Sequence, residues 1–381
     1  MVTTLYLPTK IIFGSGCVAR LGAEVRRLGK RAVLVTGSHS ARQTGLLDKV
    51  TRNLENNGLE VCIFDKVVSN PRASTVDEGA RLVCQKGVDL IIGLGGGSAM
   101  DTAKCMVLAS SGGKPIWDYY IGARDIEVVE PLLPLVLVPT VAASGSEANN
   151  AAVITNWETH EKRVLFSPAF FSKVSIVDPE LTLTLPQKPT AQGGVDIFCH
   201  VGECYITTER ASPLTDGILE TVMKLVVETL PQALSKLDDI EFRTKLSWAS
   251  TIACSPVRYL GSGAGYLTLH GIELPLSGYY DIAHGDGLAA LLPAWMKYTF
   301  PVRQERFDSL GRNVFGETDG IAAVERWLDR VGMKLNLRTL GIEPQRIKDI
   351  ADCAVRVAPQ LSKHPNLLDA SAVAQIYRNS Y

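Results

Sequence analysis

Four side chains in the second half of the chain have the types and spacing of a metal site. Asp196 and His200 lie four residues apart in GGVDIFCHVGECYIT, so on a helix both project from one face. His270 and His284 delimit a second segment, HGIELPLSGYYDIAHGDG. One carboxylate and three imidazoles, without a thiolate, suit Fe(II), Zn(II) or a similar divalent ion. The alternative is that Asp196 caps a turn and the histidines are ordinary core or surface groups.

A glycine turn in the first half has the form of a phosphate-binding site. The apolar segment DLIIGL ends in a turn made of Gly95, Gly96, Gly97 and Ser98. A helical pattern begins at once, so free N–H groups and the helix dipole favour an anion there. The turn departs from the standard dinucleotide fingerprint because Ser98 stands where the third glycine is expected. The alternative is a tight turn without a ligand, with Asp101 and Lys104 as surface residues.

A second loop has small and hydroxyl side chains at a strand end, where ligands bind in α/β sheets. It reads PTVAASGSEANNAAVIT and includes Thr140, Ser144 and Ser146. Loops of this composition are common, so this loop alone is weak evidence.

Alternating strands and helices must position these loops. Apolar strand patterns occupy residues 32–37, 61–65, 88–98 and 133–140, and helical patterns occupy 44–58, 75–87 and 99–113. Strands separated by helices of this length predict parallel pairing in a Rossmann-like α/β domain.

The pattern changes near LTLTLPQKPTA, where prolines interrupt the chain. Helical patterns then follow one another at 190–206, 213–230, 240–258, 285–299, 301–314, 318–332, 343–360 and 369–379. The sequence therefore predicts an α/β dinucleotide-binding domain over residues 1–185 and an all-helical metal-binding and catalytic domain over 186–381. A site between the two domains would bring cofactor and metal together.

Composition argues against several classes of partner. Lys and Arg number 39 against 40 Asp and Glu, so nothing points to nucleic acid or a membrane surface. No apolar run is long enough to span a bilayer, and MVTTLYLPTKIIFG lacks the pattern of a signal peptide. Eight scattered cysteines without a CxxC pair are typical of free thiols. We therefore expect a cytoplasmic protein.

With these motifs in view, the chain resembles the iron-containing (group III) alcohol dehydrogenase family. The likeness covers nearly the whole length, through PTKIIFGSG, NPRASTVDEG, GGGSAMDTAK, SIVDPEL, HGIELPLSGYYDIAHGDGLAALLP and ASAVAQIY. The branch of butanol dehydrogenases and broad aldehyde reductases is the most similar. The resemblance implies a dehydroquinate synthase-like architecture and a homodimer or larger homo-oligomer. The edge strand near TLYLPTKIIFG is a candidate for pairing between chains.

The resemblance also implies roles for individual residues. It makes Asp196, His200, His270 and His284 the ligands of Fe(II), with Zn possible, and catalysis proceeds through that metal. It assigns Gly96, Gly97 and Ser98 to the pyrophosphate and Thr140, Ser144 and Ser146 to the nicotinamide pocket. Lys162 and Leu181 match positions along the adenosine and ribose groove.

Two departures from the family pattern affect function. The family often has a histidine four residues after the third ligand, where this chain has Leu274, so the proton route is in doubt. Relatives that prefer NAD usually carry Asp after the first strand, where this chain has Gly37 followed by Ser38 and Ser40. Without a carboxylate to repel a 2′-phosphate, NADP(H) is favoured over NAD(H). The alternative is a permissive loop that still takes NAD(H).

The expected activity is metal-dependent hydride transfer between NAD(P)H and short- to medium-chain aldehydes or alcohols. A pocket with no evident arginine clamp for a carboxylate favours aliphatic substrates. Phe198, Trp248 and Tyr280 could line that pocket, but aromatics at helical positions are more often core. Two alternatives stay open: a glycerol-type polyol dehydrogenase or related lyase on the same scaffold, and a catalytically silent nucleotide-binding protein.

Overall fold

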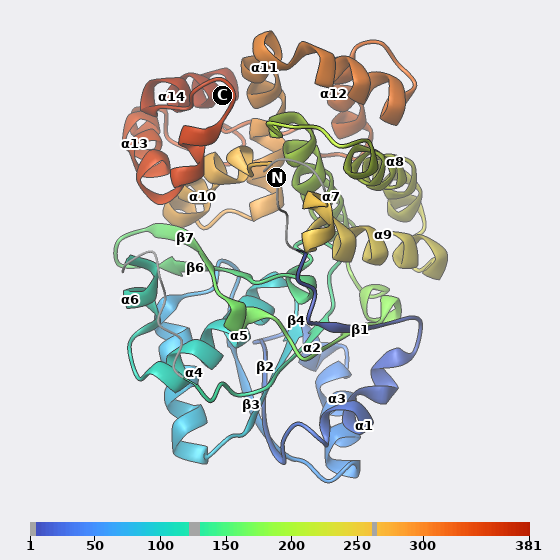
Figure 1. Ribbon diagram of the computed structural model, residues 1–381, viewed down its shortest axis with the longest axis vertical. Helices are drawn as coiled ribbons and strands as arrows, with labels where there is room; N and C mark the ends of the chain where they lie inside the picture. Colours follow the sequence, from blue (N-terminus) through green and yellow to red (C-terminus); the bar gives the residue numbers. More distant parts are fainter. Residues whose placement is uncertain (1–4, 122–129, 261–264) are drawn as a thin grey trace.

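An α/β half and a helical half lie one above the other in the molecule (Figure 1). The computed structural model describes residues 5–121, 130–260 and 265–381; Thr4, the first residue of the predicted edge-strand segment, lies outside them. The predicted fold class, a parallel-sheet domain followed by helices, is confirmed. The division at residue 185 falls between the last strand and the first long helix of the helical half, and it stays a prediction.

A six-stranded sheet forms the centre of the α/β half. Its order is β1-β8-β5-β4-β2-β3, and every neighbouring pair is parallel. A separate antiparallel hairpin, β6–β7, reaches toward the helical half. The strands are β1 (Lys10–Phe13), β2 (Arg31–Gly37), β3 (Glu60–Val67), β4 (Leu90–Gly95), β5 (Leu135–Pro139), β6 (Ala151–Asn156), β7 (Glu161–Phe166) and β8 (Val174–Val177). The sequence patterns did not predict β8 or the hairpin.

Helices cover both faces of this sheet, so its central strands are apolar on both sides. In β2, Val33 and Val35 pack with α4 and α5, whereas Ala32 and Leu34 pack with α1 and α3. Side chains of a strand point alternately to the two faces, which explains this division. The helices of this half are α1 (Leu21–Val25), α2 (Ser40–Gln43), α3 (Leu46–Asn56), α4 (Ala73–Lys86), α5 (Gly97–Gly112) and α6 (Ile116–Ile121).

The second half is built from helices around α7, whose residues are almost all buried. These helices are α7 (Gln187–Thr207), α8 (Pro213–Ser235), α9 (Ile240–Ala253), α10 (Thr268–Tyr280), α11 (His284–Leu310), α12 (Gly320–Arg330), α13 (Ile347–Val357) and α14 (Ala370–Asn379). Within the described ranges, no helix is long and apolar enough to cross a membrane.

Some helix boundaries differ from the sequence predictions. The predicted helix 240–258 ends at Ala253, because Pro256 begins a short 3-10 turn, η5 (Pro256–Tyr259). The predicted helices 285–299 and 301–314 are joined in α11, with Arg303 non-helical at φ −137° and ψ 24°, close to Pro301. The sequence patterns did not predict α10 as a separate helix. It contains Pro275, which is unfavourable inside a helix.

Candidate metal and cofactor site

Asp196 and His200 lie one turn apart on α7, as their spacing predicts. Both are buried, with 5% and 6% of their surface exposed. His200 Nδ1 lies 2.9 Å from the Asp196 carbonyl oxygen and 3.3 Å from Asp196 Oδ1. Donation from Nδ1–H to that carbonyl leaves Nε2 of His200 as the nitrogen that can bind a metal.

His270 and His284 approach the same carboxylate from two other helices. His270 is in the first turn of α10 and His284 begins α11. Their Nε2 atoms lie 3.3 Å and 3.8 Å from Asp196 Oδ1. Ligand atoms of Asp196, His270 and His284 all lie within 4.8 Å of one another. His200 is not part of that group, but its ring centre is 4.4 Å from that of His270.

Two buried polar atoms at this point lack the partner that burial demands. Asp196 Oδ1 and His270 Nε2 face each other without a hydrogen bond, and neither has a hydrogen-bond partner elsewhere in the described residues. Unsatisfied buried atoms are costly and call for an explanation such as an ion. A carboxylate oxygen and imidazole nitrogens are suitable donors for Fe(II) or Zn(II), so the residues present fit a divalent metal.

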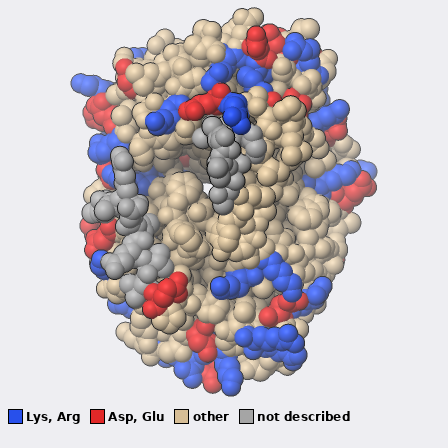
Figure 2. Space-filling model, viewed as in Figure 1, with Lys and Arg blue, Asp and Glu red and all other residues tan. Residues whose placement is uncertain are grey.

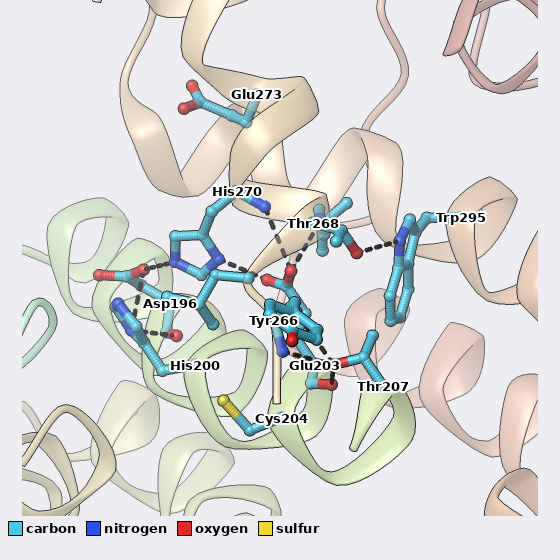
Figure 3. Close-up of polar contacts among 12 residues, drawn as sticks. Asp196, His200, Glu203, Cys204, Thr207, Tyr266, Thr268, His270, Glu273 and Trp295 are labelled. Carbon is cyan, nitrogen blue, oxygen red and sulfur yellow. Dashed lines mark hydrogen bonds and ion pairs between the residues drawn. The ribbon is translucent and has the colours of Figure 1, made fainter. Parts of the chain in front are cut away.

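Two glutamates that the sequence analysis missed hold the histidine rings. Figure 3 shows the His270 ring between the carboxylates of Asp196 and Glu203. Glu203 accepts a hydrogen bond from His270 Nδ1, and Glu273 accepts one from His284 Nδ1. Both glutamates are buried. This arrangement turns Nε2 of each histidine toward Asp196, as carboxylate–histidine–metal sites do.

The four candidate ligands differ in protonation state because their surroundings differ. Burial lowers the pKa of His200 to about 4, which keeps it neutral and able to bind a metal. Burial would also lower the pKa of His270, but Glu203 and Asp196 outweigh it and raise that pKa to about 10. The three histidines hold the pKa of Asp196 below its usual range, although burial opposes this. Asp196 is therefore ionised, ready to hold a cation.

A cavity of about 1570 Å³ connects this cluster with the glycine turn. All four predicted metal ligands line it, as do all the predicted cofactor residues: Gly37, Ser38, Ser40, Gly95, Gly96, Gly97, Ser98, Asp101, Thr140, Ser144, Ser146, Lys162 and Leu181. Phe198, Trp248 and Tyr280 do not line it. The surface in view in Figure 2 is hollowed near its centre, and charges of both signs are scattered around the hollow.

The glycine turn is shaped for close approach of a ligand. Gly96 precedes α5 as its N-cap, and Gly95 has a φ of 153°, which side chains rarely adopt. A Cβ atom at Gly97 would lie 2.8 Å from Ser144 Oγ. The two predicted cofactor loops therefore contact each other at the N-terminus of α5.

The alternative that Asp101 and Lys104 are surface residues is wrong. Both are buried, with 8% and 0% of their surface exposed. Asp101 accepts hydrogen bonds from Ser146 Oγ at 2.6 Å and from the Val153 N–H at 2.9 Å. Lys104 Nζ donates to Asn149 Oδ1 at 3.0 Å, and burial lowers its pKa to about 8. These side chains therefore fix the second cofactor loop to α5.

Lys162 lies beside Glu273, one of the two glutamates that hold the histidine rings. Its Nζ donates to Asn70 Oδ1 at 2.9 Å and lies 3.9 Å from Glu273 Oε2. Glu273 in turn holds His284. Leu274, where the family often has a histidine, is buried and lines the same cavity.

Both halves of the chain match descriptions of one known protein family. Residues 8–179 match the family described as "Iron-containing alcohol dehydrogenase", and residues 190–381 match "Fe-containing alcohol dehydrogenase family, C-terminal". The chain belongs to the iron-containing alcohol dehydrogenase family. It is an NAD(P)-dependent alcohol dehydrogenase of the iron type, and the resemblance read from the sequence motifs is confirmed.

Similar proteins span nearly the same length as this alcohol dehydrogenase. The probable NADH-dependent butanol dehydrogenase 2 of Bacillus subtilis is 36% identical over 93% of this chain and 92% of its own. NADH-dependent butanol dehydrogenase A of Clostridium acetobutylicum is 32% identical over 98% of each chain. The crystal structure of NADH-dependent butanol dehydrogenase A from Thermotoga maritima has a TM-score of 0.94 and 32% identity, covering 100% of this chain and 98% of that one.

Proposed function

We propose that this enzyme interconverts short- to medium-chain aldehydes and alcohols at an Fe(II) site held by Asp196, His200, His270 and His284, with Zn as a second metal. The observation that carries the proposal is the pair of buried atoms without a hydrogen bond, Asp196 Oδ1 and His270 Nε2. They belong to residues that line the same cavity as the glycine turn. The names of the butanol dehydrogenases to which the chain is similar support the substrate class.

The two loops and the hairpin bind the nicotinamide cofactor. Backbone N–H groups of Gly96, Gly97 and Ser98 bind the pyrophosphate at the N-terminus of α5. Thr140, Ser144 and Ser146, fixed through Asp101, border the nicotinamide. The contact of Lys162 with Glu273 supports moving its role from the adenosine groove to the ribose beside the nicotinamide.

The chain's own residues orient the reacting groups and limit the proton routes. A divalent metal, when bound, supplies Lewis acidity toward the substrate oxygen. Glu203 and Glu273 keep the Nδ1 protons of His270 and His284, so that both Nε2 atoms face the site. The loops hold the nicotinamide against the substrate carbon. Leu274 has no titratable group, so the proton passes through water and the ribose hydroxyls.

The choice between NADH and NADPH depends on the cavity wall at Gly37, Ser38 and Ser40. Relatives named for NADH do not support the NADP(H) preference predicted from Gly37. Arg42 does not line the cavity and is paired with Asp65 at 2.6 Å. We propose that both cofactors bind, because no carboxylate lines the described cavity at these residues.

The test is activity resolved by metal and by cofactor. The purified enzyme is stripped with a chelator, Fe(II) or Zn(II) is restored anaerobically, and oxidation of NADH and NADPH is followed with butyraldehyde. We expect activity only after a metal is restored, with both cofactors used. If neither metal supports reduction of butyraldehyde although one metal binds per chain, the aldehyde reductase assignment fails. Turnover of glycerol would then favour the polyol dehydrogenase, and its absence the silent scaffold.

Two further proposals concern the assembly of the enzyme and its location in the cell. β1 lies at an edge of the six-stranded sheet, with exposed Leu5, Tyr6 and Leu7 just before it, which supports pairing between two chains. All eight cysteines are free, which supports a reducing, cytoplasmic location. The molar mass in solution, from light scattering, tests the homo-oligomer directly.

A further inference from the structure

A buried arginine lies in the wall of the cavity near the metal ligands. Arg258, in η5, is 8% exposed and lines the cavity. Its Nη1 lies 3.7 Å from Cys254 Sγ, and a Cβ atom at Gly145 would lie 2.7 Å from Cys254 Cβ. Gly145 stands between Ser144 and Ser146 in the second cofactor loop. Arg258 is therefore close to the loop that we propose borders the nicotinamide.

Arg258 lacks the anionic partner that a buried guanidinium normally has. Its Nε atom has no hydrogen-bond partner, and no carboxylate of the described residues lies within 4.0 Å of its guanidinium nitrogens. The sequence GSGA of residues 261–264 contains no acid either. A thiol is a weak acceptor, and Tyr259, whose ring lies 4.7 Å from Cζ of the guanidinium, offers a neutral hydroxyl rather than an anion.

The missing anionic partner distinguishes Arg258 from Lys162, the other cationic residue in the described cavity lining. Of the Lys and Arg residues that line the described cavity wall, Lys162 is paired with Asn70 and Glu273. Arg258 has only neutral partners and an unpaired Nε, and the same cavity is also lined by the apolar side chains of Leu267 and Leu274. A planar fork of N–H donors in a cavity that also has apolar lining residues matches a carboxylate on a short carbon chain.

We propose that Arg258 binds a carboxylate of the substrate, so that the preferred substrates are aldehydes bearing an acid group and the corresponding hydroxy acids. The inference rests on the proposed function, because it names the substrate class of the same site. Hydride moves from the reduced nicotinamide to the carbonyl carbon, and a proton from water reaches the oxygen. The carboxylate is unchanged and serves only to anchor the chain.

Matched aldehydes test this preference. Values of kcat/KM are measured for 4-oxobutanoate against butanal and for 5-oxopentanoate against pentanal, in wild type, Arg258→Gln, Arg258→Lys and Arg52→Gln. Loss of one partner from a buried charged pair typically weakens binding by about 30-fold or more. We expect wild type to prefer a charged member of the pairs and Arg258→Gln to lower that preference by at least this factor. Arg258→Lys retains part of it, and Arg52→Gln, on the exposed face of α3, retains all of it.

Equal kcat/KM for charged and uncharged members in wild type would overturn the proposal. So would an equal loss on both members in Arg258→Gln, which is the result of a merely structural role. If no aldehyde is reduced, the proposed function fails, and calorimetric binding decides the inference separately. Binding of 4-hydroxybutanoate that exceeds that of 1-butanol and weakens in Arg258→Gln supports the anchor. Binding that the substitution leaves unchanged refutes it.

Discussion

Replacing Glu203 by Gln should weaken the metal site without touching a ligand. Glu203 uses both carboxylate oxygens: Oε1 accepts from His270 Nδ1, and Oε2 accepts from the backbone N–H groups of Leu269 at 2.5 Å and His270 at 3.3 Å. Glutamine keeps one acceptor oxygen but turns an NH2 group toward donors on one side. The ring of His270 then loses the hydrogen bond that directs Nε2 toward Asp196.

The expected magnitude follows from measured effects of such supporting groups. Their loss typically costs 10- to 100-fold in metal affinity, which corresponds to about 1.4–2.7 kcal/mol. Glu203 is fully buried and both of its oxygens are engaged, so we expect the upper end, about 100-fold. The dissociation constant for Zn(II) is measured by competition with a chromophoric chelator, and the melting temperature of the metal-free variant confirms that it folds.

Glu220→Gln is the matched control. Glu220 accepts from Tyr205 Oη at 2.7 Å and from Asn313 Nδ2 at 2.8 Å, and it contacts none of the metal ligands. If Glu203→Gln changes the Zn(II) dissociation constant no more than this control does, then the hydrogen bond to His270 does not orient the ligand. The reasoning about both glutamates would then be wrong.

Three further predictions use the cleft and the ligand cluster. Gly97→Ala brings a Cβ atom against Ser144 Oγ and should raise KM for NADH about tenfold, through about 1.4 kcal/mol of lost binding. Gly217→Ala is the control, because Gly217 has open space around it and its replacement should leave KM unchanged. Equal KM values in the two variants would contradict the prediction. Leu274→His places an imidazole with a pKa of about 6.5 on the cavity wall, so the pH–rate profile should gain a step near that pH. An unchanged profile argues against a role for this position in proton transfer. In the metal-free protein, Glu203 and Asp196 raise the pKa of His270 to about 10 against the effect of burial. Its proton therefore stabilises the fold fully below about pH 6.5 and is lost as pH rises toward 10, so the melting temperature should fall over that window; a fall equally large in His270→Gln would refute the assignment to His270.

The parallel sheet was predictable because its central strands are buried on both faces and are therefore continuous apolar runs. AVLVTG became β2 and LPLVLVPT became β5. The sequence signal of β8 was weaker, because this strand has only four residues and lies among short 3-10 turns. Helix α10 was missed because Gly271, Pro275 and Gly278 disguise it, and its helical state depends on packing against α11 and α13.

Spacing predicted the four ligand candidates and could have predicted their supports. Glu203 follows His200 by three residues on α7, and Glu273 follows His270 by three on α10, so each shares a helix face with a ligand. Arg258 carried no such signal. Its place beside the cavity depends on how η5 packs against α8 and α9. Such tertiary packing cannot be predicted from the spacing of residues along the chain.

The contact of Lys162 with Glu273 joins the two halves of the enzyme at the point where the ligands meet. Lys162 comes from the hairpin of the α/β half, and Glu273 holds His284 in the helical half. Arg72 and Asp281 form a second link between the halves, with 2.6 Å between their charged groups. If nucleotide binding displaces Lys162, the displacement acts on Glu273, which holds His284. By thermodynamic reciprocity, the factor by which the metal changes the affinity for nucleotide equals the factor by which nucleotide changes the affinity for metal.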